Sequence, residues 1–317
     1  MSFAGRDVLL RGRVSRLLGW SLTGVALGFV GWQLTQGGTW QLAGDHLERL
    51  APAVLLGAIT YALASFLLAE AWRQLLGADA GSAPAAAYHA VYGRTQIIKY
   101  LPGNVFHFAG RQILGRRLGH EQAALALASM AEILLLLLVA ASLAAPLVPR
   151  WLSLDPAVAL ALAALAVAAG LAIRPLLSGG TRFSRWRAWS ARITPLRLCR
   201  AALLYAAFFV IGGVLLWLLT LSAGGRDVDT CDLAISISAL ALAWMAGFVT
   251  PGSSAGFGVR EAVLIMALQS SLDREAAVLV ALAMRLVTLV GDILFLAASL
   301  ALPLPRAHSP AVSTSIN

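Results

Sequence analysis

Charged residues are scarce in this sequence. Only 12% of the 317 residues are Asp, Glu, Lys or Arg, whereas an ordinary soluble domain has about 25%. Hydrophobic residues make up 59% of the chain, and the mean hydropathy is +0.80. A chain with so little charge does not have water as its main solvent, so the composition predicts a polytopic membrane protein.

Cysteine and histidine are also scarce. The two cysteines, Cys199 and Cys231, have no CxxC or Cys/His spacing, which argues against a disulfide framework and against a metal site. The sequence has no GxSxG, P-loop or HExxH motif, so we expect neither an enzyme nor a cofactor. The net charge of +9 comes from arginines in short loops between apolar segments, which favours a membrane over nucleic acid as the partner.

Long apolar runs are abundant, and each is long enough to cross a bilayer core of about 30 Å. Six uninterrupted spans are predicted, at residues 17–34, 52–69 (extending helically toward 76), 122–148, 155–173, 201–222 and 276–302.

Two further stretches, 84–117 and 233–270, are each broken near the middle by a Pro-Gly pair. Proline and glycine interrupt a helix and let the chain reverse, so these stretches predict re-entrant hairpins. The expected fold is therefore all-α, with six spans and two broken hairpins in one domain over residues 17–304. A basic N-terminus, 1–16, and a short tail, 305–317, flank this domain.

Loop charges predict the orientation. The connection 174–200 holds seven arginines and no acid, which marks it as cytoplasmic. Both termini then also lie in the cytoplasm, at a bacterial cytoplasmic membrane, provided that each hairpin enters and leaves on one side. Among the connections predicted to lie outside is the one that contains Asp45, Glu48 and Arg49.

The two broken stretches resemble each other. In each, an arginine follows nine residues after the proline of the Pro-Gly pair, namely Arg111 and Arg260. The spans that follow set Glu132 opposite Arg285. Three spans separate the hairpins, which predicts an inverted-topology repeat of the kind found in transporters. The alternative is that Pro-Gly pairs are common at breaks between helices, and that spans rich in alanine and leucine align with almost any apolar segment.

Residues at the helix breaks are the first candidates for a site. The predicted break residues are Pro102, Gly103, Pro251, Gly252, Gly256 and Gly258. Half-helix N-termini at such breaks carry partial positive charge, which suits a phosphate.

Polar side chains near the breaks are predicted to bind the headgroup of a lipid. These residues are Lys99, Asn104, Arg111, Arg260 and Glu261. Arg260 is the foremost candidate, because a guanidinium holds phosphate oxygens in a bidentate fork. The alternatives are that Arg94, Lys99 and Arg111 extend to the membrane interface, and that Arg260 pairs with a carboxylate such as Glu132.

Charges well inside predicted spans are the second kind of candidate, because they are costly unless they face a partner or a wet cavity. Glu132, Arg285 and Asp292 are such residues. Arg285 and Asp292 are seven residues apart, two turns along one helix face, so they predict a polar network with Glu132 facing it. A purely structural network of salt bridges is the competing interpretation.

The break motifs are similar to those of the lysylphosphatidylglycerol synthase transmembrane-region family, a family of flippase-like membrane proteins. The similarity is carried by KYLPGN at 99–104 with GR at 110–111, and by PG at 251–252 with GFGVRE at 256–261. It extends over about residues 15–300, and departs from the family at 253–255, where the family tends toward glycines and this chain has SSA.

The resemblance implies a stand-alone membrane part without the family's soluble synthase domain. It implies a lipid flippase or transporter for an anionic phospholipid or a polyprenyl-phosphate-linked headgroup. Further expected partners are a second copy of the chain or a separate lipid-modifying enzyme. Two other classes stay open. One is a membrane-embedded transferase subunit of a lipid-linked glycan or aminoacyl-lipid pathway, for which Glu261 and Glu132 are poor candidate acids. The other is an accessory protein that transports nothing.

Overall fold

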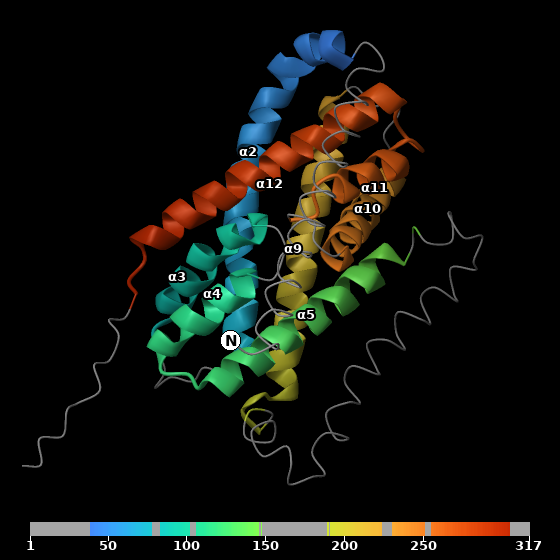
Figure 1. The fold of residues 1–317 in the computed structure, drawn as a ribbon. Helices are drawn as coiled ribbons and strands as arrows, with labels where there is room; N and C mark the ends of the chain where they lie inside the picture. Colours follow the sequence, from blue (N-terminus) through green and yellow to red (C-terminus); the bar gives the residue numbers. More distant parts are fainter. Residues whose placement is uncertain are drawn as a thin grey trace, which may run out of the picture.

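The computed structural model describes residues 39–77, 83–101, 106–145, 147, 189, 191–223, 230–250 and 255–304. Within these ranges the regular structure is entirely helical, as predicted (Figure 1). The α-helices are α2 (Thr39–Leu75), α3 (Ala85–Gln96), α4 (Phe106–Gly115), α5 (Gln122–Ala144), α9 (Pro195–Ser222), α10 (Thr230–Val249), α11 (Val259–Leu268) and α12 (Arg274–Ala301). Two 3-10 helices, η1 (Ile97–Tyr100) and η2 (Arg116–Leu118), follow α3 and α4.

Four of these helices contain segments long and apolar enough to cross a membrane. The segments are Leu50–Leu75 in α2, Gln122–Ala144 (α5), Pro195–Ser222 (α9) and Arg274–Ala301 (α12). They correspond to four of the six predicted spans. The other two predicted spans, 17–34 and 155–173, lie outside the described residues, as do the predicted terminal segments 1–16 and 305–317.

Each stretch predicted to be a broken hairpin consists of two shorter helical pieces. In the first, α3 and η1 precede the break and α4 follows it, while α10 and α11 flank the second break. Of the predicted break residues, Gly256 and Gly258 have φ angles of 74° and 80°, a left-handed conformation that glycine adopts without strain. The other four predicted break residues lie outside the described residues, namely Pro102, Gly103, Pro251 and Gly252. Asn104 also lies outside them.

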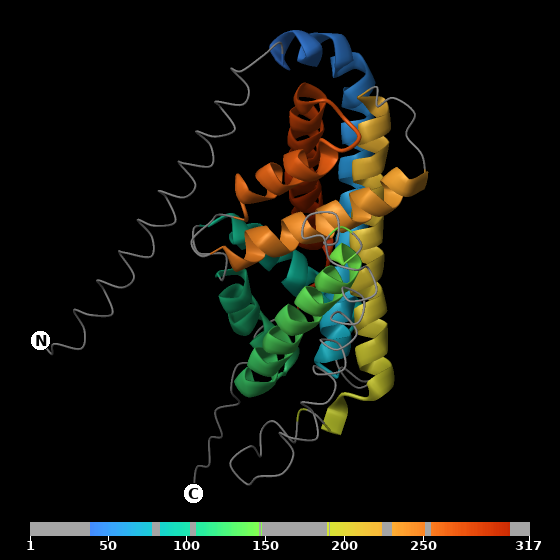
Figure 2. The ribbon, with the colours of Figure 1, turned by 90° about the vertical axis from the view of Figure 1, so that its right-hand side faces the viewer.

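Helix α2 begins well before the predicted span. Asp45, Glu48 and Arg49, expected in a connecting loop, lie inside the helix, which continues through Pro52. The loop prediction was wrong because these charges mark the end of the apolar run and not the end of the helix. Figure 2 shows the N-terminal part of α2 bending away from the axis of the rest. A proline inside a helix causes such a bend, because it removes one backbone hydrogen bond.

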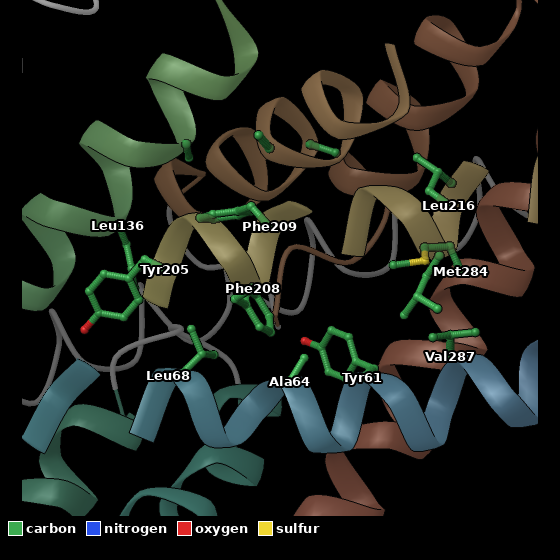
Figure 3. Close-up of a cluster of buried hydrophobic side chains, with 14 of the residues drawn as sticks. Tyr61, Ala64, Leu68, Leu136, Tyr205, Phe208, Phe209, Leu216, Met284 and Val287 are labelled. Atoms are coloured by element: carbon green, nitrogen blue, oxygen red, sulfur yellow. The ribbon is translucent and has the colours of Figure 1, made fainter. Parts of the chain in front are cut away.

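Helices α2 and α9 lie side by side, and α12 crosses α2 obliquely (Figures 1 and 2). Figure 3 shows Tyr61 of α2 and Phe208 of α9 turned toward each other beside Val287 of α12. The two rings meet edge to face, with centroids 5.5 Å apart. Surrounding lipid is as apolar as these side chains, so helices in a membrane are held mainly by such close packing and by polar contacts.

Contacts between the helices are paired across two sets, α2 to α5 and α9 to α12. Helix α3 packs on α12, while α10 packs on α5. Helix α2 packs on α12 and α5, while α9 packs on α5 and α12. Helices α2, α3, α4 and α5 correspond in order to α9, α10, α11 and α12. For each of these contacts, the corresponding pair of helices is also in contact. The packing is thus reciprocal between the two sets of helices.

The crossing of α2 and α12 depends on a glycine. A Cβ atom at Gly291 would lie 2.7 Å from Cδ1 of Tyr61 and 2.9 Å from the carbonyl oxygen of Ala58. Both distances are shorter than a normal contact, and one of them is to backbone that cannot rotate away. Gly291 is thus a small residue that lets two membrane helices approach closely.

We expect Gly291→Val to force α2 and α12 apart and to lower the free energy of unfolding by about 1–3 kcal/mol, the usual cost of overpacking. The measurement is the midpoint of thermal unfolding in detergent. Ala298→Val is the matched control, because Ala298 lies on the exposed face of the same helix. Equal shifts for the two variants would show that the crossing does not require a small residue at 291.

Candidate functional site

Arg111 of α4 and Glu132 of α5 form a buried ion pair. Both side chains are 1% exposed, and Nη1 of Arg111 donates to Oε2 of Glu132. Nη2 donates to Gln96 at 3.2 Å, the hydroxyl of Tyr92 donates to Oε1 of Glu132 at 2.8 Å, and the guanidinium lies 3.8 Å from the centroid of the Tyr92 ring. Arg111 therefore does not extend to the interface, and Glu132 compensates its charge in this structure.

Lys99, at the end of η1, is paired with Asp292 of α12. Nζ lies 2.7 Å from Oδ2 and 2.9 Å from Oδ1, and the hydroxyl of Tyr100 donates to Oδ2 at 2.6 Å. Lys99 and Tyr100 are neighbours in η1, and both are more than 190 residues away from Asp292 in the sequence. The pair ties the first break to the last span, and it places Lys99 inside the protein and not at the interface.

Arg285 of α12 contacts the second break. Its Nε lies 3.5 Å from Oε1 of Glu261, its Nη1 donates to the carbonyl oxygen of Ala255 at 3.3 Å, and its guanidinium lies 3.7 Å from the centroid of the Phe257 ring. Glu261 also accepts the backbone N–H of Gly258 at 2.5 Å. Glu261 is thus the N-terminal cap of α11 as well as the acidic neighbour of Arg285.

Helix α12 joins both breaks, since its Asp292 contacts residues beside the first and its Arg285 contacts residues beside the second. Asp292 and Arg285 were predicted to share one face of this helix, and their contacts agree with that prediction. Glu132 does not face them as predicted: its hydrogen bonds go to Arg111 and Tyr92. The predicted three-residue network is therefore divided between two separate clusters.

Arg260 has no ion pair within the described part of the chain, and its Nε is buried without a hydrogen-bond partner. The predicted alternative partner, Glu132, is held by Arg111. The side chain packs into a slot between two glycines, because a Cβ at Gly247 would lie 2.7 Å from Cγ of Arg260 and one at Gly256 would lie 2.6 Å from Nε. The slot fixes the position of an uncompensated guanidinium.

Arg260 and Arg285 line one cavity of about 40 Å³, which has room for a few water molecules. Its remaining polar lining includes Tyr61, Glu261 and Thr288, and its apolar lining includes aromatic rings of α9 and α10. Tyr61, Phe208 of α9 and Arg285 each lie near the middle of a candidate span. The cavity therefore lies about midway along three spans, which is the depth at which transporters bind their substrates.

Three unmet hydrogen-bond donors belong to arginines that line this cavity. Arg285 has a side chain only 10% exposed, and its Nε and Nη2 are buried without a hydrogen-bond partner, as is Nε of Arg260. The 3.5 Å contact of Arg285 with Glu261 is electrostatic and lacks hydrogen-bond geometry. A buried unmet donor costs about 1–3 kcal/mol, so an anion with several acceptor oxygens would be bound favourably here.

The two stretches that the sequence comparison aligned differ in charge. In the first, the aligned positions hold Arg111 and Glu132, which neutralise each other. In the second, they hold Arg260 and Arg285, which are both basic, and only Glu261 lies between them as a carboxylate. One half therefore has a closed ion pair, whereas the other has a cavity lined by excess positive charge.

No protein-family model matches this chain, and no curated protein matches it either. The family resemblance therefore stays a prediction from the motifs.

Sequence reasoning identified the charged members of both clusters but missed their aromatic and amide partners. Tyr61, Tyr92 and Gln96 lie in helical segments where a tyrosine or glutamine gives no special signal. Tyr100 stood inside the KYLPGN motif, and its position beside Lys99 was the available clue. Gly247 gave no signal, because its role depends on the side chain that packs on it.

Loss of one partner of the Arg111–Glu132 pair is expected to be severe. Glu132→Leu leaves a buried guanidinium without its counter-charge and should lower the free energy of unfolding by about 3–5 kcal/mol. The double variant Arg111→Met, Glu132→Leu should recover most of that loss, because it removes both charges. Thermal unfolding in detergent measures each variant, with the exposed Arg116→Met as the control. A double variant no more stable than the single one would contradict the pairing.

Proposed function

We propose that this protein transfers a lipid with an anionic headgroup between the leaflets of a bacterial cytoplasmic membrane. The observation that carries the proposal is the cavity midway along three spans, where Arg260 and Arg285 hold unmet N–H donors. Inside a membrane such charges are costly and mark a substrate path. The family resemblance of the break motifs points to the same activity.

Binding begins when a phosphate oxygen accepts hydrogen bonds from Arg285 and Arg260. A guanidinium offers two parallel N–H groups to such an anion, which fixes the orientation of the headgroup. The aromatic side chains of the lining, Phe208, Phe209 and Trp244, contact the less polar part of the molecule. The acyl chains stay in the surrounding lipid, so only the headgroup has to leave water.

Movement of the site uses the two broken stretches as oppositely inserted hairpins. The reciprocal packing of the two helix sets supports this arrangement. Helix α12 contacts both breaks, through Asp292 with Lys99 and through Arg285 with Glu261. A phosphate that draws Arg285 away from Glu261 weakens the contact with the second break while the first contact persists, so headgroup binding is coupled to the position of one hairpin.

The transferase alternative requires a carboxylate that is free to act as an acid or base. Glu261 caps α11 through the N–H of Gly258, and Glu132 is bound to Arg111 and Tyr92. Both carboxylates already hold structural hydrogen bonds. The geometry therefore favours binding and movement of an anion over group transfer by these residues.

Arg260→Gln and Arg285→Gln are each expected to slow headgroup transfer at least about tenfold, since each removes a charge-assisted contact of about 1.5–3 kcal/mol. The assay reconstitutes the protein in vesicles and follows a fluorescent phosphatidylglycerol by dithionite quenching of the outer leaflet. Arg94→Gln is the control. That arginine donates to the carbonyl oxygens of Ser299, Leu300 and Leu302 at the end of α12, and it does not line the cavity.

Size-exclusion chromatography and circular dichroism would establish that the variants are folded. Transfer at the unaltered rate by folded Arg260→Gln and Arg285→Gln proteins would refute the proposal.

The opposite insertion of the hairpins is tested by cysteine accessibility in intact cells. In a background with Cys199→Ser and Cys231→Ser, we expect Arg117→Cys, after the first hairpin, to react only from the cytoplasm. Ser270→Cys, after the second hairpin, should react only from outside. Both positions are exposed in the structure, so neither result depends on unfolding. Reaction of both from the same side would rule out the inverted arrangement.

A further inference from the structure

Five ionisable side chains gather around the cavity and the adjoining end of η1. The cations are Lys99, Arg260 and Arg285, and the carboxylates are Glu261 and Asp292. They come from both broken stretches and from α12. In the described part of the chain, this group has three positive charges and two negative ones.

These five side chains act as one electrostatic unit. The guanidinium of Arg285 lies 5.7 Å from the centre of the Tyr100 ring, and the hydroxyl of Tyr100 donates to Asp292. Arg260 and Arg285 line the same cavity. The Lys99–Asp292 pair is therefore part of the surroundings that an anion in the cavity experiences.

The charge count of the group is +1, from three cations minus two carboxylates. Transfer of a proton from Lys99 to Asp292 would neutralise one cation and one carboxylate together, so the count would not change. Glu261 accepts a backbone N–H and lies beside Arg285, and it supplies the second carboxylate of the group. An uncompensated charge among apolar helices is unfavourable, and a single added negative charge would remove it.

We propose that the cavity selects a headgroup with one negative charge, a phosphodiester, over a phosphate monoester with two. A phosphodiester has two non-bridging oxygens that share one charge, and these oxygens match the unmet donors of Arg285 and Arg260. A monoester carries two negative charges, whereas the net charge of the group is only +1, so one negative charge would stay uncompensated. This inference rests on the proposed function and names the substrate class of its site.

The first test compares two lipids with matched acyl chains, phosphatidylglycerol and phosphatidic acid. The purified protein binds an equimolar mixture in detergent micelles, and native mass spectrometry gives the ratio of the two bound lipids. The pH is mildly alkaline, so that the monoester is largely doubly charged, since the second pKa of a small phosphate monoester is about 6. We expect phosphatidylglycerol to be preferred about tenfold, and equal binding would overturn the inference.

Changing the charge of the group should reverse this selectivity. Glu261→Gln raises the count to +2, because it removes a carboxylate that lines the cavity while its amide oxygen can still accept the N–H of Gly258. The preference should then shift toward phosphatidic acid by about tenfold or more. Glu70→Gln is the matched control, because it also neutralises a carboxylate, but one bound to Arg73 and Gln74 that does not line the cavity. A ratio that moves equally in both variants, or in neither, would overturn the charge count.

Soluble competitors distinguish a lipid headgroup from a free phosphate compound. Dimethyl phosphate, a singly charged phosphodiester, should displace phosphatidylglycerol more effectively than inorganic phosphate does, but only at far higher concentration than a lipid. If inorganic phosphate competes better, the charge selection is wrong. If dimethyl phosphate binds as tightly as the lipid, the selection stands, but the site serves a soluble compound and the proposed lipid transfer fails.

The two proposals can also fail separately in the vesicle assay. Transfer of phosphatidylglycerol and phosphatidic acid at equal rates, both dependent on Arg260, would support the proposed function and overturn the charge selection. A folded protein that neither binds nor transfers either lipid would refute both.

Discussion

The cost of placing charges among apolar helices governs this structure. Arg111 pairs with Glu132 of the next α-helix, and Lys99 pairs with Asp292, which is 193 residues away in the sequence. A charge that has lost its partner cannot move into water here without pulling its helix out of the bundle. The pairs therefore determine how the broken stretches seat against α5 and α12.

The packing of the helices is reciprocal, but the distribution of their charges is not. The helix contacts are reciprocal between the two sets, with α3 on α12 and α10 on α5. The charges are not reciprocal, because the partner position of Glu132 in the second set is Arg285. In the first set, Arg111 and Glu132 pair with each other, whereas in the second set Arg260 and Arg285 line a cavity with only one carboxylate, Glu261. Reciprocal packing of the two helix sets therefore does not give two equivalent sites, since α12 contacts residues beside both breaks.

The tip of the second break shows how the backbone positions this site. Ala255, Gly256 and Gly258 all have positive φ angles, so the chain turns sharply before α11 begins. This turn brings Gly256 against Gly247, and the stem of Arg260 packs on both. Glu261 then caps the new helix from inside. Arg260 fits here because Gly247 and Gly256 have no side chains, so its position depends on shape and not on charge.

The sequence by itself determined the all-helical class, four of the six predicted spans as helices long and apolar enough to cross a membrane, the places of the two interruptions and the charged residues at the site. These follow from apolar run length and from proline and glycine, which act locally. It did not determine the extension of α2 to Thr39 or which charge pairs with which. Only the tertiary structure assigned Glu132 to Arg111 and left Arg260 unpaired. Pairing depends on the distances between packed helices, and no local pattern encodes those distances.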